Sequence, residues 1–363
     1  MSDRRASLRV LFVAGGTEEP ATRFRFAQFF PHFEAHGVHC TLRTAYGTLY
    51  NRVHATPVLG PAYKFASRAK RALHTIGEAG AHDVVLVQRT ALPHTALPEL
   101  LASRRNPRLV FDFDDAIFLG PEGDVAPRRL GAFRRAVALS AHVVAGNGYL
   151  ARSAGVPEKT TVIPTVIDTD AYGPADAPRA ADAPLVIGWM GTAGHFGYFS
   201  ELIPSLRRLL DESPHVRFRM ISNARHADLE GLPRVEQIAW SAESERRDLQ
   251  SFDVGVMPLV DNPWTRGKCG FKMIQYMAVG APVVASAVGA NVDILEGSGA
   301  GTLVRHADEW YPALRRLVES AALRREMGAA ARRHAVTHYS VKSVLGTYLE
   351  LFRRIAGPAR VVA

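Results

Sequence analysis

The stretch from Arg266 to Ser286 reads RGKCGFKMIQYMAVGAPVVAS, and its pattern predicts a loop, a helix and a buried strand in that order. At about 100° per residue, a helix through this stretch places Lys268, Lys272 and Gln275 within roughly 60° of one another. The rest of its surface is apolar nearly all round, which is typical of a buried helix. Two ammonium groups and an amide on such a helix need a wet cleft or an anionic partner.

Two glycines, Gly267 and Gly270, stand before and inside the first turn of this predicted helix. They let a ligand approach the N-terminal N–H groups, where the helix dipole favours anions. We therefore interpret the stretch as a phosphate site with Lys268 and Lys272 as its cations. The alternative is that both lysines point into bulk water at a frayed helix start, while Gln275 fills a satisfied polar niche.

The composition is that of an ordinary globular protein with two or three domains. Its 363 residues are 47% apolar and 22% charged, which excludes a disordered or fibrous chain. The two cysteines, Cys40 and Cys269, are too far apart to indicate a zinc site or a disulfide framework. The first residues lack the apolar core of a signal peptide and no long uncharged span follows, so we expect a cytoplasmic protein.

The formal net charge of +9 is compatible with a nucleic acid, an acidic substrate or an anionic membrane surface as partner. The arginines are not interleaved with exposed aromatic residues and no nucleic-acid-binding motif occurs, so we do not expect nucleic acid. The segment from Tyr63 to Leu73 is basic and mildly amphipathic. It fits either a peripheral contact with acidic lipids at the inner face of a membrane or a plain solvated helix face.

The order of strand-like and helical segments predicts an α/β protein with two doubly wound parallel sheets. A polar stretch rich in Pro and Ala separates two similar halves and is interpreted as a linker. The predicted parts are a Rossmann-like domain over 1–172, the linker over 173–184, a second Rossmann-like domain over 185–340, and a C-terminal helix over 341–363 that packs back towards the first domain. The expected strands are 8–14, 38–43, 83–87, 109–113, 142–145 and 160–163, then 185–190, 216–222, 235–240, 254–259, 282–286 and 301–304.

Ligands of open α/β sheets bind beyond the carboxyl ends of the strands, which directs attention to the loops there. Glycine-containing turns, able to present N–H groups to a phosphate, follow the first strand of each half. Arg23 and Arg25 lie on the helix after the first strand, and they face either the ligand or bulk water. The further candidates in these loops are Gly15, Gly16, Gly191, Thr192, Arg89 and Trp240.

Three carboxylates stand at the end of a buried strand, at Asp112, Asp114 and Asp115. Alternation along the strand sends Asp112 and Asp114 to the same side, and like charges this close raise one another's pKa. These groups are suited to orient a hydroxyl nucleophile, to act as a base or to bind a divalent cation. Helix capping and loop hydrogen bonding by Asp115 is the structural alternative.

Several motifs follow one another in a fixed order along the chain. They read DVGVMPL over 253–259, DNPW over 261–264, GK at 267–268 and KMIQYMAVGAPVVAS over 272–286, with AGNGYLA over 145–151, IPTVID over 163–168 and VGAN over 288–291. Together they resemble a family 4 glycosyltransferase of the GT-B fold, the glycosyl transferases group 1 type. The resemblance covers nearly the whole chain.

The resemblance implies two Rossmann-like domains facing across a cleft, and transfer of a hexose or related sugar from a nucleoside diphosphate sugar. The second domain would hold the donor and the first a saccharide, lipid-linked or small-molecule acceptor, with retention of configuration and with neither metal nor cofactor. In that family a Glu ahead of Ala-Met-Ala or Tyr-Met-Ala binds the donor ribose, and a second Glu lies eight residues earlier. Here these positions are Gln275 and Gly267. The family's Arg and Lys pair also has no match around 192–199, which leaves Lys268 and Lys272 for the diphosphate.

Each candidate residue thus has an expected role. Asp114, Asp115 and Lys272 would serve the chemistry, and Arg23, Arg25 and Arg89 the acceptor. The donor would be held by Gly15, Gly16, Gly191, Thr192, Trp240, Lys268, Lys272 and Gln275. Two other readings stay open, namely a GT-B sugar-nucleotide epimerase or phosphorylase, and a degenerate GT-B protein that acts only as a partner.

Overall fold

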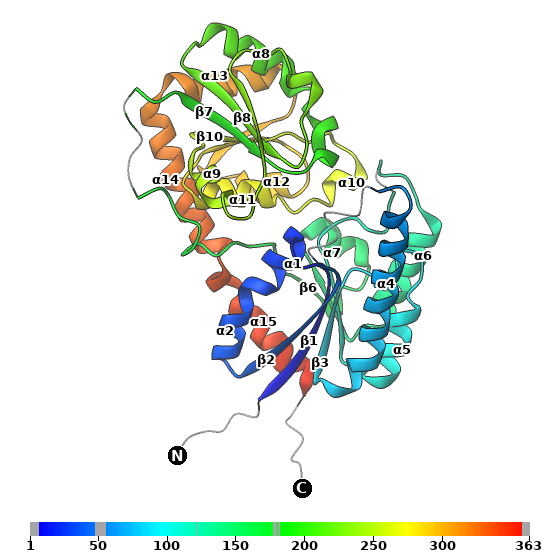
Figure 1. Ribbon diagram of the computed structural model, residues 1–363. Helices are drawn as coiled ribbons and strands as arrows, with labels where there is room; N and C mark the ends of the chain where they lie inside the picture. Colours follow the sequence, from blue (N-terminus) through cyan, green and yellow to red (C-terminus); the bar gives the residue numbers. More distant parts are fainter. Residues whose placement is uncertain (1–6, 48–55, 121, 177–179, 181, 358–363) are drawn as a thin grey trace, which may run out of the picture. The chain divides into compact units, whose positions relative to one another are not determined.

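The computed structural model describes residues 7–47, 56–120, 122–176, 180 and 182–357, and it divides into two α/β units (Figure 1). Unit 1 comprises Met1–Val166, Asn262–Cys269 and Val344–Ala363, and unit 2 comprises Ile167–Asp261 and Gly270–Ser343. The expected border at residue 172 differs from this division, and the eight residues Asn262–Cys269 fold with unit 1. Residues 177–179 and 181 of the expected linker lie outside the described residues.

The sheet of unit 1 has six parallel strands in the order β2-β1-β3-β4-β5-β6. The strands are β1 (Leu8–Gly16), β2 (Val38–Tyr46), β3 (Val84–Gln88), β4 (Leu109–Phe113), β5 (His142–Ala145) and β6 (Thr160–Val162). The helices are α1 (Pro20–Arg25), α2 (Phe30–Ala35), α4 (Leu59–Glu78), α5 (Leu97–Arg105), α6 (Pro127–Leu139), α7 (Gly148–Ala154), α10 (Pro263–Arg266) and, from residue 344 onward, α15 (Val341–Ala356). Each strand predicted in the first half overlaps one of these strands.

Helices cover both faces of this sheet, and the side chains of β1 alternate between the two faces. Phe12 lies on one face, where its ring is 5.4 Å from that of Phe26 and 5.9 Å from that of Phe352 on α15. Leu11 and Val13 lie on the opposite face, in a core shared with residues of α5 and α6. A parallel sheet buried on both faces requires such continuous apolar strands, which is why they could be located from the sequence.

Unit 2 has a second sheet of six parallel strands in the order β12-β11-β10-β7-β8-β9. The strands are β7 (Leu185–Met190), β8 (Val216–Ser222), β9 (Val235–Ala239), β10 (Val254–Met257), β11 (Val283–Ser286) and β12 (Gly301–Val304). The helices are α8 (Leu202–Glu212), α9 (Glu245–Gln250), α11 (Phe271–Ala278), α12 (Ala290–Leu295), α13 (Trp310–Glu319) and α14 (Ala321–His338). The strand order reverses between β7 and β10, and in open α/β sheets ligands bind beyond the carboxyl ends at such a point.

Two glycines in register bring α11 close to this reversal point. Gly188 on β7 pairs with Gly255 on β10, and a Cβ atom at Gly255 would lie 2.2 Å from the ring of Tyr276 on α11. Because that side chain is missing, the ring of Tyr276 packs directly on the sheet and its hydroxyl accepts a hydrogen bond from the backbone N of Met190 at 3.0 Å. The helix is thereby fixed to the carboxyl end of β7.

Candidate functional site

The helix expected within the 266–286 stretch begins only after Gly270. This glycine has a φ of +62° and stands directly before α11, so Lys268 precedes the helix and Lys272 lies in its first turn. A Cβ atom at Gly270 would also lie 2.4 Å from Cδ1 of Ile294, so both the backbone and the packing require glycine here. The prediction that Lys268, Lys272 and Gln275 share one helix face was therefore wrong for Lys268, which folds with unit 1.

Lys272 and Gly191, which are far apart in the sequence, meet at the carboxyl end of β7. A Cβ atom at Gly191 would lie 2.5 Å from Cε of Lys272 and 2.6 Å from Cζ2 of Trp189. The Lys272 ammonium is 5.8 Å from the centre of the Trp189 ring, a distance at which the ring still attracts a cation. Gly191 thus leaves room for the lysine side chain to pass over the end of the strand.

The loop after β7 is held by short contacts within unit 2. Its Ala193 N donates to Oδ1 of Asn223 at 2.9 Å, and Thr192 Oγ1 lies 3.1 Å from Nδ1 of His195. Gln275 lies one turn beyond Lys272 on α11, with its side chain buried. The structure therefore brings Gly191, Thr192 and Lys272 to the carboxyl end of β7 and places Gln275 on the same short helix.

Trp240 does not join this group within unit 2, and Gly15 and Gly16 belong to unit 1. Trp240 follows β9, the outermost strand, and its Nε1 donates to Glu245 Oε2 at 2.9 Å. Two strand spacings, about 10 Å, separate β9 from β7. Gly15 and Gly16 end β1 in unit 1, where a Cβ atom at Gly15 would meet Oε2 of Glu19 at 2.1 Å. The Glu19 carboxylate thus lies directly against this glycine turn, and binding of a phosphate by the turn stays a prediction.

In unit 1, Arg25 forms a fully buried ion pair with Asp112. Its Nε donates to Asp112 Oδ1 at 2.9 Å, and its Nη1 donates to the backbone O of Ile163 and to Oγ1 of Thr165, both at 3.1 Å. Arg25 is only 1% exposed. The prediction that Arg25 binds an acceptor was wrong, because its guanidinium is enclosed and bonded within the unit. Removing one partner of such a pair costs about 3–5 kcal/mol of folding free energy.

A second charged group lies at the carboxyl ends of β3 and β4. Arg89 donates through Nε to Asp114 Oδ1 at 3.0 Å and through Nη2 to Asp115 Oδ2 at 2.8 Å. Lys268 Nζ lies 2.9 Å from Asp115 Oδ1. All four side chains are partly buried, with Arg89 the most exposed at 35%. This arrangement brings together four residues that we had predicted for three different tasks.

The charges around Asp114 and Arg89 determine the direction in which their pKa values shift. Burial alone would raise the pKa of Asp114, but the positive charges of Arg89, Arg25 and Lys268 hold it below its ordinary value. Burial opposes the charge of Arg89 as well, yet Asp114 and Asp115 raise its pKa above the ordinary value. A general base works best with a pKa near the working pH. Asp114 is therefore suited to accept a hydrogen bond from a hydroxyl and poorly suited to remove its proton.

The same contacts concern the divalent cation that we considered as a ligand of the three carboxylates. Oxygens of Asp112, Asp114 and Asp115 accept hydrogen bonds from arginine or lysine. Among the described residues, no group of three or more His, Cys, Asp or Glu side chains is arranged to hold a metal ion. These aspartates are thus arranged as partners for cations of the protein itself.

The sequence reasoning gave no role to Asn147, which fixes Lys268 in place. Asn147 caps α7 by accepting from Leu150 N at 2.8 Å, and its Nδ2 donates to the backbone O of Gly267 at 3.2 Å and of Lys268 at 3.0 Å. A Cβ atom at Gly146 would lie 2.4 Å from Sγ of Cys269. An Asn directly before a helical segment is a capping signal, and it could have pointed to Asn147 but not to its second contact.

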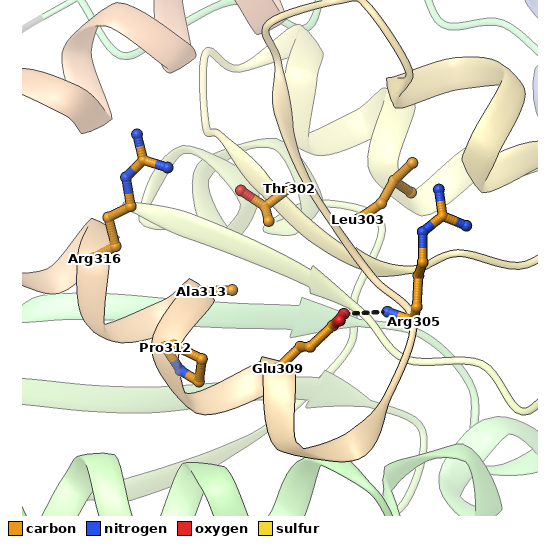
Figure 2. Close-up of a pocket in the computed structure, with 7 residues that line it drawn as sticks. All are labelled: Thr302, Leu303, Arg305, Glu309, Pro312, Ala313 and Arg316. Carbon is orange, nitrogen blue, oxygen red and sulfur yellow. Dashed lines mark hydrogen bonds between the residues drawn. The ribbon is translucent and has the colours of Figure 1, made fainter.

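Two further features belong to neither of these groups. Arg23 on α1 has its Cζ 4.7 Å from the ring centre of Phe24, and its role towards an acceptor stays a prediction. A pocket of about 370 Å³ lies beside β12 and α13 in unit 2, where Glu309 accepts a hydrogen bond from the backbone N of Arg305 at 2.6 Å (Figure 2). Its lining is Thr302, Leu303, Arg305, Glu309, Pro312, Ala313 and Arg316, and it includes no residue predicted from the sequence.

Comparison with known proteins identifies the part of the chain that carries Gly191 and Lys272. Residues 185–320 match the family model described as glycosyl transferases group 1. This segment is a group 1 glycosyltransferase domain. A curated relative, the D-inositol 3-phosphate glycosyltransferase of Stackebrandtia nassauensis, is 27% identical to this chain over 234 residues. That match spans 56% of this chain and about half, 52%, of the relative.

Solved structures show that the chain as a whole has the GT-B fold. HepE from Anabaena, solved in complex with UDP and glucose, superimposes with a TM-score of 0.66 at 17% identity, covering 94% of this chain and 98% of that one. Sucrose-phosphate synthase from Thermosynechococcus elongatus gives a TM-score of 0.72 at 15% identity, covering 96% and 99%. At these identities, the likeness to the solved structures shows the fold alone.

Proposed function

We propose that this protein is a glycosyltransferase that moves a hexose or related sugar from a nucleoside diphosphate sugar to a saccharide, lipid-linked or small-molecule acceptor. In this reaction the bond from the anomeric carbon to the diphosphate breaks, a bond to the acceptor hydroxyl oxygen forms, and the hydroxyl proton passes to the departing diphosphate. We further propose retention of the anomeric configuration and catalysis without a metal. The observation that carries the proposal is the passage of Lys272 over Gly191 at the carboxyl end of β7, within the glycosyltransferase domain.

The diphosphate requires positive charge because negative charge develops on it as it leaves. Lys272 supplies an ammonium group beside the strand reversal of unit 2, where a preorganised charge stabilises the leaving group. In the proposal, Thr192 and the backbone of the same loop contact the phosphates. Gln275 stands where the family has a ribose-binding Glu, and its amide oxygen is able to accept a hydrogen bond from a ribose hydroxyl.

Unit 1 supplies the proposed acceptor contacts. Asp114 and Asp115 form ion pairs with Arg89, and Asp115 also forms one with Lys268. In the proposal, Asp114 orients the acceptor hydroxyl by accepting its hydrogen bond, and Arg89 contacts the rest of the acceptor. We assign the diphosphate to Lys272 because its side chain passes over the carboxyl end of β7 in unit 2.

The test compares two lysine variants in nucleotide binding. UDP, ADP and GDP are titrated by calorimetry into the wild type, Lys272→Ala and Lys342→Ala, because Lys342 is an exposed lysine of unit 2 in a surface ion pair with Asp170. We expect Lys272→Ala to weaken binding by about 1.5–3 kcal/mol, the value of one charge-assisted contact, and Lys342→Ala to leave it unchanged. Unchanged binding by Lys272→Ala would remove Lys272 from the donor site.

The same proteins distinguish the other enzyme readings. Incubation with the matching nucleotide sugar and an acceptor releases a nucleoside diphosphate if the protein is a transferase, and an epimeric nucleotide sugar if it is an epimerase. Incubation of a glycoside with inorganic phosphate releases a sugar 1-phosphate if the protein is a phosphorylase. If no nucleoside diphosphate or nucleotide sugar binds the wild type, the degenerate-partner reading replaces the proposed function.

A further inference from the structure

Helix α4 presents an apolar face that unit 1 leaves uncovered. Nine large apolar side chains are exposed within the described residues, and four of them lie on or directly before this helix. Val58 is 77% exposed, Leu59 63%, Phe65 77% and Leu73 70%. Exposed apolar side chains scattered singly over a surface are normal, whereas a group along one helix indicates a contact surface.

Three of these side chains form one continuous stripe along the helix. At about 100° per residue, Val58, Phe65 and Leu73 fall within an arc of about 80°, together with the small residues Ala62 and Ala69. The opposite side of the helix packs inward through Gly60, Ser67, Arg71 and Thr75. Figure 1 shows α4 as a long helix beside α5 in unit 1. The stripe therefore faces away from the sheet that α4 covers.

Positive charge accompanies the stripe. The sequence from Thr56 to Gly77 contains no Asp or Glu, but it contains Lys64, Arg68, Lys70 and Arg71. Lys70 is exposed beside the stripe, while Arg71 turns inward to the backbone O of Gln88. The acidic residue that ends the helix, Glu78, is already bonded to Arg43 and His74. The surroundings of the apolar face on this helix thus favour a negatively charged partner.

We infer that α4 docks on the surface of a bilayer that contains anionic lipids. Phe65 and Leu73 enter the boundary between headgroups and acyl chains, and basic side chains such as Lys70 meet the lipid phosphates. The contact is peripheral, since no helix in the described ranges has the length and apolar content to cross a bilayer. A second copy of this chain is a poorer partner, because its α4 would bring the same positive charges together.

The test is flotation of the full-length protein with vesicles of phosphatidylglycerol and phosphatidylcholine in equal parts, and with vesicles of phosphatidylcholine alone. Phe65→Ser/Leu73→Ser removes two residues of the stripe. Val125→Ser/Val336→Ser is the matched control, because it removes two exposed apolar side chains from other surfaces. Thermal unfolding of each variant confirms that it folds.

We expect the wild type and the control to bind the anionic vesicles and to bind phosphatidylcholine weakly. The Phe65→Ser/Leu73→Ser variant should lose at least about tenfold in vesicle affinity, and high salt should weaken binding of the wild type. The inference is overturned if the stripe variant binds like the control, if the wild type ignores anionic vesicles, or if the variant changes only the oligomeric state.

This inference stands apart from the proposed function. Nucleoside diphosphate affinity is measured on the same three proteins and should be equal in all of them, because the variants leave Lys272 and Gly191 untouched. Loss of vesicle binding with normal nucleotide binding supports the α4 surface alone. Absence of nucleotide binding with normal vesicle binding contradicts the proposed function alone.

Discussion

Gly191→Ala tests whether the meeting of Lys272 and the β7 loop forms the donor site. The new methyl group would lie 2.5 Å from Cε of Lys272 and 2.6 Å from Cζ2 of Trp189, whereas ordinary van der Waals contacts begin at 3.4 Å. The lysine stem must therefore retreat by about 0.9 Å or more to reach an ordinary contact distance. The Trp189 ring cannot give way as easily, because it is buried at 1% exposure.

Two effects of different size follow from this geometry. Overpacking against the Trp189 ring should lower the free energy of unfolding by about 1–3 kcal/mol. Displacement of Lys272 should remove one charge-assisted contact with the diphosphate, about 1.5–3 kcal/mol, which corresponds to a roughly 10- to 150-fold higher Kd. The first effect is measured by urea unfolding and the second by calorimetric titration with the nucleoside diphosphate that binds the wild type.

Gly194→Ala is the matched control in the same loop. A Cβ atom at Gly194 has no neighbour within 4 Å, so this variant should keep both the stability and the affinity of the wild type. The reasoning is refuted if Gly191→Ala binds the diphosphate as tightly as Gly194→Ala. If both variants weaken binding equally, the loop backbone and not the position of Lys272 determines the affinity.

Two more predictions concern unit 1. Asp114→Asn should lower nucleotide-sugar turnover, measured as released nucleoside diphosphate, by more than it lowers donor affinity, and a variant with full turnover would move the acceptor contact elsewhere. Burial, with the nearby charges of Arg354 and Lys159, lowers the pKa of His142 to about 4 from 6.5. The folded state therefore resists protonation of His142. The contribution of neutral His142 to the free energy of unfolding should be complete above pH 6.5 and should be lost as the pH drops towards 4. His142→Gln should reduce this dependence in urea unfolding at several pH values, and an unchanged slope would contradict the assignment.

Local patterns were sufficient to predict the strands and the fold class. Runs such as Leu109–Phe113 are apolar because both faces of a parallel strand are buried, and this requirement is visible within five residues. The α/β alternation then fixed two doubly wound sheets. The candidate site was predicted less well, because its geometry depends on partners far apart in the sequence, such as Arg25 and Asp112, which are separated by 87 residues.

The error over Lys268 has a specific physical cause. A glycine inside a helical pattern reads the same whether it continues the helix or stops it, and Gly270 stops it by adopting a positive φ. Its packing against Ile294 is a contact between residues far apart in the sequence, and sequence periodicity does not reveal such contacts. Arg25 was misjudged for a similar reason, since its short helix α1 carries no clear polar face to distinguish a buried arginine from an exposed one.

The segment Asn262–Cys269 affects the design of chimeras in which the second half of the chain is exchanged between relatives. A transplanted second half, cut at the sequence border near residue 185, would carry these eight residues into a new host. There they would need a host residue to do what Asn147 does for the backbone of Gly267 and Lys268, and a host carboxylate in place of Asp115. Chimeras should therefore be designed with this segment inherited from the same parent as the first half.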